Sequence, residues 1–113
     1  MSRFNRLPQF EREMKRLTKK YKSLPRDIAI FERVLEQNPT GIGASFAIIR
    51  ANESVQIVKA RLACRTLRAK SLRIIYAYHK NINTFTYLEI YFKGDKENED
   101  RARIEEYLKD CQA

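Results

Sequence analysis

The spacing of apolar residues most constrains the fold of this sequence, because it changes twice along the chain. Up to about residue 40, apolar side chains recur every three or four positions. From about residue 45 to 93 they recur every second position, and after residue 97 the longer spacing returns. The longer spacing is typical of an amphipathic helix, and the shorter one of a strand with one buried face. This order of elements predicts an α+β fold.

Two helices are predicted in the first part of the chain. Their apolar stripes are Phe10, Met14, Leu17 and Tyr21, and then Leu24, Ile28, Phe31 and Leu35. Ser23-Leu24-Pro25 indicates a break, with Ser23 as a possible N-cap of the second helix. The second helix is expected to end at Asn38-Pro39-Thr40-Gly41, because Pro39 disfavours a helical conformation at the residue before it. Helices joined this closely are expected to fold back as a hairpin.

Four strands and a last helix are predicted in the remainder. The strands cover 46–49, 55–63, 72–79 and 85–93, and the helix covers Glu97 to Asp110. Ile104, Tyr107 and Leu108 form the apolar stripe of this helix, and acidic residues fill its first turns. The predicted structure is a single domain, 1–113, with an N-terminal helical hairpin packed on a twisted, mainly antiparallel four-stranded sheet and a C-terminal helix.

The charge of the chain narrows its function. With 23 Lys and Arg against 14 Asp and Glu, the net charge is +9 and the pI is about 9.8. Such a balance is typical of proteins that bind nucleic acid. The segment 41–93 alone carries 9 basic and 2 acidic residues. No signal peptide or membrane span is apparent, so we expect a cytoplasmic protein. Cys64 and Cys111 lack the spacing of a zinc site and are expected to be reduced.

Alternation along the strands gathers the basic residues on one face of the predicted sheet. Strand side chains point alternately to the two faces, so the side opposite the apolar one should carry Lys59, Arg61, Arg73, Lys93, Tyr87, Tyr91 and Glu89. Arg65, Arg68 and Lys70 follow in a loop beside it. A merely solvated face would explain such charges. Four cations with one carboxylate repel one another, however, and the tyrosines among them suit phosphates with stacked bases.

Several short blocks resemble the RelE/ParE superfamily of bacterial toxins from type II toxin–antitoxin systems. They are Val58-Lys59-Ala60-Arg61, Leu72-Arg73-Ile74-Ile75-Tyr76 and Glu89-Ile90-Tyr91-Phe92-Lys93, in this order after two helices. The segment Tyr91–Asp100 is similar to one RelE-like subgroup. The resemblance implies either mRNA cleavage, usually in the ribosomal A site, or inhibition of DNA gyrase. It also implies a cognate antitoxin as protein partner.

The RelE-like reading implies a metal-independent endoribonuclease without a cofactor. Lys59 and Arg61 would match the basic pair that holds the mRNA phosphates, and Arg73 the arginine that stabilises charge on the scissile phosphate. Lys93 would be a further phosphate ligand. The nucleophile would be the 2′-hydroxyl of the RNA itself. The protein would mainly orient this hydroxyl and neutralise the negative charge that develops at the phosphate.

The residue that transfers the proton is open at this stage. Many RelE-like nucleases place a Tyr or His near the C-terminus, where this chain has an acidic helix and Tyr107 is expected in the core. Tyr91, Glu89 and His79, which is the only histidine, are the candidates that remain. Glu89 could equally balance Lys59 or Arg73. A gyrase inhibitor, or a nucleic-acid-binding protein without catalysis, therefore stays as an alternative function.

Overall fold

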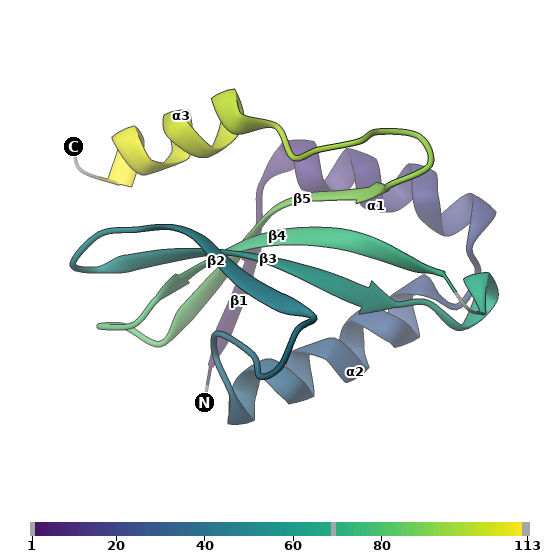
Figure 1. Ribbon diagram of the computed structural model, residues 1–113, viewed down its shortest axis with the longest axis horizontal. Coiled ribbons are helices and arrows are strands. Elements are labelled where there is room, and N and C mark those ends of the chain that lie inside the picture. The colour runs from purple at the N-terminus through teal and green to yellow at the C-terminus, as the bar shows by residue number, and fades with distance from the viewer. Residues whose placement is uncertain (1, 69, 112–113) are drawn as a thin grey trace.

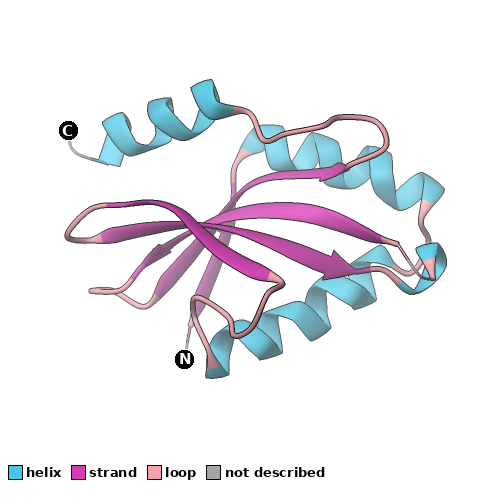
Figure 2. Ribbon diagram, in the orientation of Figure 1, coloured by secondary structure: helices cyan, strands magenta, loops and turns pink. Residues whose placement is uncertain are grey.

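The computed structural model describes residues 2–68 and 70–111 (Figure 1). These residues fold into three α-helices and one sheet. Figure 2 shows the helices around the twisted sheet. The elements are β1 (Arg3–Arg6), α1 (Pro8–Lys20), α2 (Leu24–Gln37), β2 (Phe46–Ala51), β3 (Val55–Ala63), the 3₁₀ turn η1 (Arg65–Leu67), β4 (Ser71–His79), β5 (Thr84–Phe92) and α3 (Arg101–Cys111). The predicted α+β fold with an N-terminal helix pair and a C-terminal helix is confirmed. No helix in the described ranges is long and apolar enough to cross a membrane.

The sheet has five strands in the order β1-β5-β4-β3-β2, so the prediction of four strands was wrong. The missed strand is β1, which pairs with β5 in parallel, whereas the other neighbours are antiparallel. Phe4 is the only apolar residue of β1 and stacks on Phe85, with ring centroids 4.8 Å apart. A four-residue strand with one apolar side chain shows no alternation of apolar and polar residues in the sequence. Backbone pairing with β5 holds it in place instead.

Both faces of the sheet are covered, but unequally. The hairpin of α1 and α2 buries the larger core on one face, around Phe10, Leu24 and Tyr76. On the other face α3 buries a smaller cluster through Ile104 and Leu108. Figure 1 shows α2 and α3 on opposite sides of the sheet. The second face is therefore not the open surface that was predicted, and only the part beyond α3 is free for a ligand.

Helix α1 lies beside β5 where β1 stops. β1 pairs only with Thr84–Tyr87, and the chain then passes directly into α1. The Glu13 carboxylate accepts a hydrogen bond from the Ile90 N–H at 3.2 Å, beyond the last residue of β5 that β1 reaches. The same carboxylate binds the Arg103 guanidinium of α3 through two hydrogen bonds of 3.0 Å. One side chain thus joins the first helix, the last strand and the last helix.

A β-bulge in β5 changes which side chains share a face. Ile75 is opposite Glu89 and Tyr76 is opposite Tyr87, so Leu88 is the additional residue. Tyr87 therefore lies on the hairpin face, fully buried, and its hydroxyl donates to Glu32 at 3.0 Å. Burial raises the pKa of Tyr87 far above that of a free tyrosine. The prediction that Tyr87 lies on the basic face, and Leu88 on the opposite one, was wrong.

Helix α3 begins at Arg101, four residues later than predicted. The Asp100 carboxylate accepts a hydrogen bond from the Arg103 N–H at 3.1 Å, which is the geometry of an N-cap. Glu97 and Glu99 therefore lie in the preceding loop and not in the first helical turn.

Candidate nucleic-acid interface

Arg61 and Arg73 form the centre of the candidate interface. They lie directly opposite each other on the neighbouring strands β3 and β4, so both side chains point to the α3 side of the sheet. The Arg73 Nη1 donates to the Ser71 hydroxyl at 3.0 Å. Within the described residues, neither guanidinium forms an ion pair with a carboxylate. Two like charges in this position repel each other, and a bound anion would relieve the repulsion.

An open cleft of about 410 Å³ lies in front of these two arginines. Lys70 and Lys93 add two exposed cations to it, and the Lys70 ammonium lies 5.9 Å from the centroid of the Phe92 ring. The residues that line this basic cleft are Arg61, Lys70, Ser71, Arg73, Phe92, Lys93 and Gly94. No acidic residue is among them, so the cleft favours an anionic ligand.

Tyr91 completes a row across the sheet, because it lies opposite Arg73 on β5. Its side chain is only 3% exposed, and its hydroxyl has no hydrogen-bond partner among the described residues. Burial raises the pKa of Tyr91 and the nearby Lys59 opposes this rise. The hydroxyl is therefore protonated at neutral pH and can donate its proton.

Lys59 lies two residues before Arg61 on β3 and shares its face, but a carboxylate occupies it. The Lys59 Nζ lies 2.9 Å from the Glu99 Oε1, in the loop between β5 and α3. This hydrogen bond is the main cause that raises the pKa of Lys59. The three cations predicted to act together are thus on one face, with Lys59 held by Glu99 and the two arginines open to the cleft.

Glu89 is buried, with 1% of its surface exposed, and holds the loop before α3. Its Oε1 accepts a hydrogen bond from the Asp100 N–H at 2.8 Å, and its Oε2 forms an ion pair with Lys96. The interpretation that it balances Lys59 or Arg73 was wrong, because Lys96 is its partner. Both carboxylate oxygens are engaged, and Glu89 does not line the cleft.

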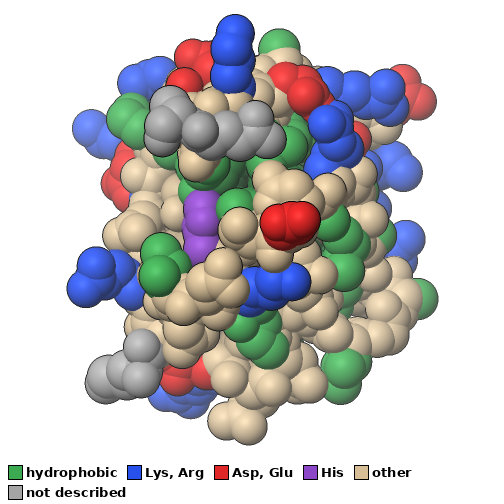
Figure 3. Space-filling model, turned by 90° about the vertical axis from the view of Figure 1, so that its left-hand side faces the viewer, with side chains coloured by type: hydrophobic (Ala, Val, Ile, Leu, Met, Phe, Trp, Pro, Cys, Tyr) green, Lys and Arg blue, Asp and Glu red, His purple; other side chains and the backbone are tan. Residues whose placement is uncertain are grey.

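His79 and the remaining basic candidates are dispersed. His79 ends β4, six residues from Arg73, and shares a hydrogen bond with the Tyr107 hydroxyl of α3. Figure 3 shows the histidine at the end of the molecule that carries the C-terminus, with lysines and arginines spread around it. Arg65 lines a separate groove between α2 and β2, which it shares with Arg61, and Arg68 is exposed after η1. The structure does not bring these three residues together.

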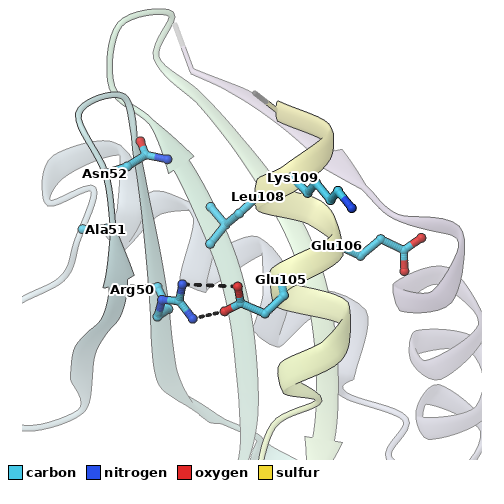
Figure 4. Close-up of a pocket in the computed structure, with 7 residues that line it drawn as sticks. All are labelled: Arg50, Ala51, Asn52, Glu105, Glu106, Leu108 and Lys109. Atoms are coloured by element: carbon cyan, nitrogen blue, oxygen red, sulfur yellow. Dashed lines mark hydrogen bonds and ion pairs between the residues drawn. The ribbon is translucent and has the colours of Figure 1, made fainter. Parts of the chain in front are cut away.

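Another hollow lies between β2 and α3 (Figure 4). The Arg50 guanidinium and the Glu105 carboxylate form an ion pair across it, so the hollow carries charges of both signs. This pair and the contact of Lys59 with Glu99 attach α3 and its loop to the sheet. The sequence analysis missed Ser71 and Glu99. The position of Ser71 two residues before Arg73, on the same strand face, is the signal that could have revealed it.

No protein-family model matches this sequence, and no curated protein matches it. Among solved structures, a chain in the crystal structure of the archaeal RelE–RelB complex from Pyrococcus horikoshii OT3 is similar, with a TM-score of 0.63. The two chains are 18% identical, and the match covers 82% of this chain and 96% of the other. This chain has a RelE-like fold. The resemblance found in the short sequence blocks is thus matched by the three-dimensional arrangement.

In the RelE-like fold of this protein, the basic cleft lies at the end of the sheet where β3 leaves and β4 enters. The strand register places Arg61, Arg73 and Tyr91 in one row across three strands. Because neighbouring strands are about 4.8 Å apart, the three side chains begin within about 10 Å of one another. This spacing fits the phosphates and sugars of one or two nucleotides.

Proposed function

We propose that this protein is the toxin of a type II toxin–antitoxin system and cleaves mRNA at the basic cleft. The observation that carries the proposal is the pair Arg61 and Arg73, opposed on adjacent strands, free of carboxylates and open to a cleft without acidic residues. The RelE-like fold supports the same conclusion. A pair of guanidinium groups can hold a phosphodiester through two-pronged hydrogen bonds.

The proposed reaction is a transfer within the RNA itself. The 2′-oxygen attacks the adjacent phosphorus and loses its proton to water in the open cleft, and the bond to the 5′-oxygen breaks. The products are a 2′,3′-cyclic phosphate and a 5′-hydroxyl. Negative charge grows on the non-bridging oxygens in the transition state, and Arg73 stabilises it from a fixed position on β4. Arg61 and Lys93 bind the phosphates.

Tyr91 is the proposed general acid. Its hydroxyl is protonated at neutral pH, belongs to the residue beside Arg73 in the row, and has no hydrogen-bond partner in the described chain. Tyr91 does not line the cleft in this structure, so the step requires a local movement that exposes the hydroxyl to the RNA. A protonated phenol can transfer its proton to the departing 5′-oxygen, because an alkoxide is the stronger base. Lys59 lies near Tyr91 and stabilises the phenolate that forms. Glu89 and His79 have no role in this mechanism.

The proposal includes a protein partner and a location. The similar solved structure is a complex named RelE–RelB, and a cognate antitoxin that places acidic side chains over the cleft would block it. Positive charge on the toxin would speed this association. The protein would act in the cytoplasm on transcripts that are being translated.

Arg73→Ala tests the proposed reaction. We expect cleavage to fall by roughly 10²–10³-fold, because the variant lacks the donor that stabilises the transition state. Arg73→Lys should recover only a small part of the lost cleavage activity, since an ammonium lacks the forked geometry of guanidinium. The measurement is the mapping of new transcript 5′ ends after expression, together with cleavage by purified protein with and without ribosomes.

Lys80→Ala is the matched control, because Lys80 is an exposed cation at the opposite end of β4. It should cleave like the parent protein. If the parent stops growth and produces no new 5′ ends, the nuclease proposal fails, and a supercoiling assay with purified DNA gyrase then tests the alternative target.

A further inference from the structure

Helix α1 carries a stripe of four cations on its solvent-exposed side. At 100° per residue, Arg12, Arg16, Lys19 and Lys20 span about 100° of the helix surface, and Lys20 lies next to Glu13. Glu13 bonds to Arg103 of α3, which directs Glu13 and the neighbouring Lys20 end of the stripe toward α3. All four cations are exposed. The exposed Arg33 lies on α2 and is not part of this stripe.

The charge of this stripe is not balanced by nearby carboxylates. Glu11 pairs with Arg6, and Glu13 is engaged by Arg103 and the Ile90 N–H. None of the four stripe residues forms an ion pair within ranges 2–68 and 70–111. The stripe is thus a free cationic surface.

The α1 stripe is continuous with the basic cleft through two aromatic rings. The Lys20 ammonium lies 5.6 Å from the Tyr21 ring, and the Tyr21 and Phe92 rings are 6.3 Å apart. Phe92 lines the cleft, and the Lys70 ammonium also lies 5.9 Å from the centroid of its ring. Cations therefore follow one another from the cleft around the edge of the sheet to α1, and nothing acidic interrupts them in this contact series.

We propose that the α1 stripe binds the phosphodiester backbone of the RNA strand that occupies the cleft. The inference rests on the proposed function and adds a second, extended site for the same substrate. The strand leaves the cleft past Phe92, and its following phosphates bind Lys20, Arg16 and Lys19, with Arg12 at the far end. Such contacts hold the strand in register but do not read its bases.

The chemistry of the stripe favours RNA over a protein partner. Protein interfaces depend on apolar or aromatic anchors in their centre. The large exposed hydrophobic side chains of the described chain are Ile30, Val34, Ile42, Ile48 and Ile82, and none of them is on α1. A polyanionic backbone needs no such anchor, because its affinity comes from cations that displace counterions.

The test compares two triple variants that remove equal charge. Arg16→Gln/Lys19→Gln/Lys20→Gln removes the centre of the stripe, and Arg33→Gln/Lys80→Gln/Lys109→Gln removes three exposed cations elsewhere. The probes are fully 2′-O-methylated RNAs of 4 and 12 nucleotides, which cannot be cleaved, and binding is followed by fluorescence anisotropy from 50 to 300 mM NaCl. Thermal melting checks that both variants are folded.

We expect the stripe variant to lower the slope of log affinity against log salt by about 2 for the 12-mer, at about 0.7 for each lost phosphate contact. The 4-mer should bind it as it binds the parent protein, because so short a strand occupies only the cleft. The control variant should match the parent with both RNAs.

Three results would overturn the inference. An unchanged slope with the 12-mer would show that no phosphates reach α1, and an equal loss in both triple variants would show a mere effect of net charge. If the stripe variant loses affinity only for a 12-residue poly-glutamate probe and still binds RNA like the parent protein, the stripe binds an acidic protein instead. Separately, if Arg61→Gln/Arg73→Gln leaves 4-mer binding unchanged, the cleft is not an RNA site and the proposed function itself fails.

Discussion

The hydroxyl of Tyr91 is an unusual group for a folded protein, because it is buried and has no hydrogen-bond partner among the described residues. Leaving such a group unsatisfied costs about 1–3 kcal/mol. We therefore expect Tyr91→Phe to raise the free energy of unfolding by about 1 kcal/mol and to lower RNA cleavage by roughly 10²-fold. Urea denaturation and single-turnover cleavage measure the two effects.

The opposite signs of these effects distinguish catalysis from structure. A tyrosine that served only the core would show the same gain in stability without any loss of activity, since phenylalanine keeps the ring and removes the unsatisfied hydroxyl. Tyr76→Phe is the control, because the Tyr76 hydroxyl donates to the Pro39 carbonyl at 2.8 Å. That variant should lose stability and keep its activity.

Residue placement could be predicted from alternation wherever the strands are regular. Arg61 and Arg73 were assigned to one face correctly, because β3 and β4 pair without interruption over nine residues. Tyr87 was assigned to the wrong face, because the bulge at Leu88 reverses the alternation within β5. Apolar residues lie on both sides of this strand, so its sequence contains no signal of the reversal.

At the scale of elements, the loop between β5 and α3 is attached to the sheet by ion pairs. Hydrogen bonding to Lys59 lowers the pKa of the Glu99 carboxyl below its usual 4.5. The resulting stabilisation is present above pH 4.5 and is lost as the pH falls through the lowered pKa. We expect Glu99→Gln to reduce the stability at neutral pH by up to about 1 kcal/mol and to flatten its decline in acid.

Urea midpoints between pH 2.5 and 7 test this expectation. Glu106→Gln provides the comparison, because Glu106 is exposed on α3 and forms no ion pair in the described chain. It should leave the pH profile unchanged. Identical acid profiles for Glu99→Gln and the parent protein would contradict a stabilising role for this contact.

The boundaries of elements were harder to predict than their existence. The two N-terminal helices and the strands β3, β4 and β5 have long apolar patterns and were found within one or two residues. β1 was missed, because its stability comes from pairing with a distant strand. The start of α3 was placed too early, since an acidic run looks like a first helical turn while Asp100 caps the helix only at its end.

At the scale of the whole molecule, the net charge of +9 opposes folding through repulsion. Because the α1 stripe and the cleft place cations close together, we expect added salt to stabilise the free protein. The urea midpoint should rise between 50 and 300 mM NaCl, where the screening length falls from about 14 to 6 Å. A falling midpoint would mean that the attractive pairs Arg103–Glu13, Lys59–Glu99 and Arg50–Glu105 outweigh the repulsion.

The position of Glu13 limits how a ligand can bind beside β5. A peptide that adds to a sheet as a strand forms hydrogen bonds with the free main-chain N–H and C=O groups of an exposed edge strand. Along this half of β5 the Ile90 amide already serves the Glu13 carboxylate, and helix α1 takes the place of a sixth strand. Helix α1 therefore blocks strand addition along this part of β5, so molecules that dock there must be held by side chains alone.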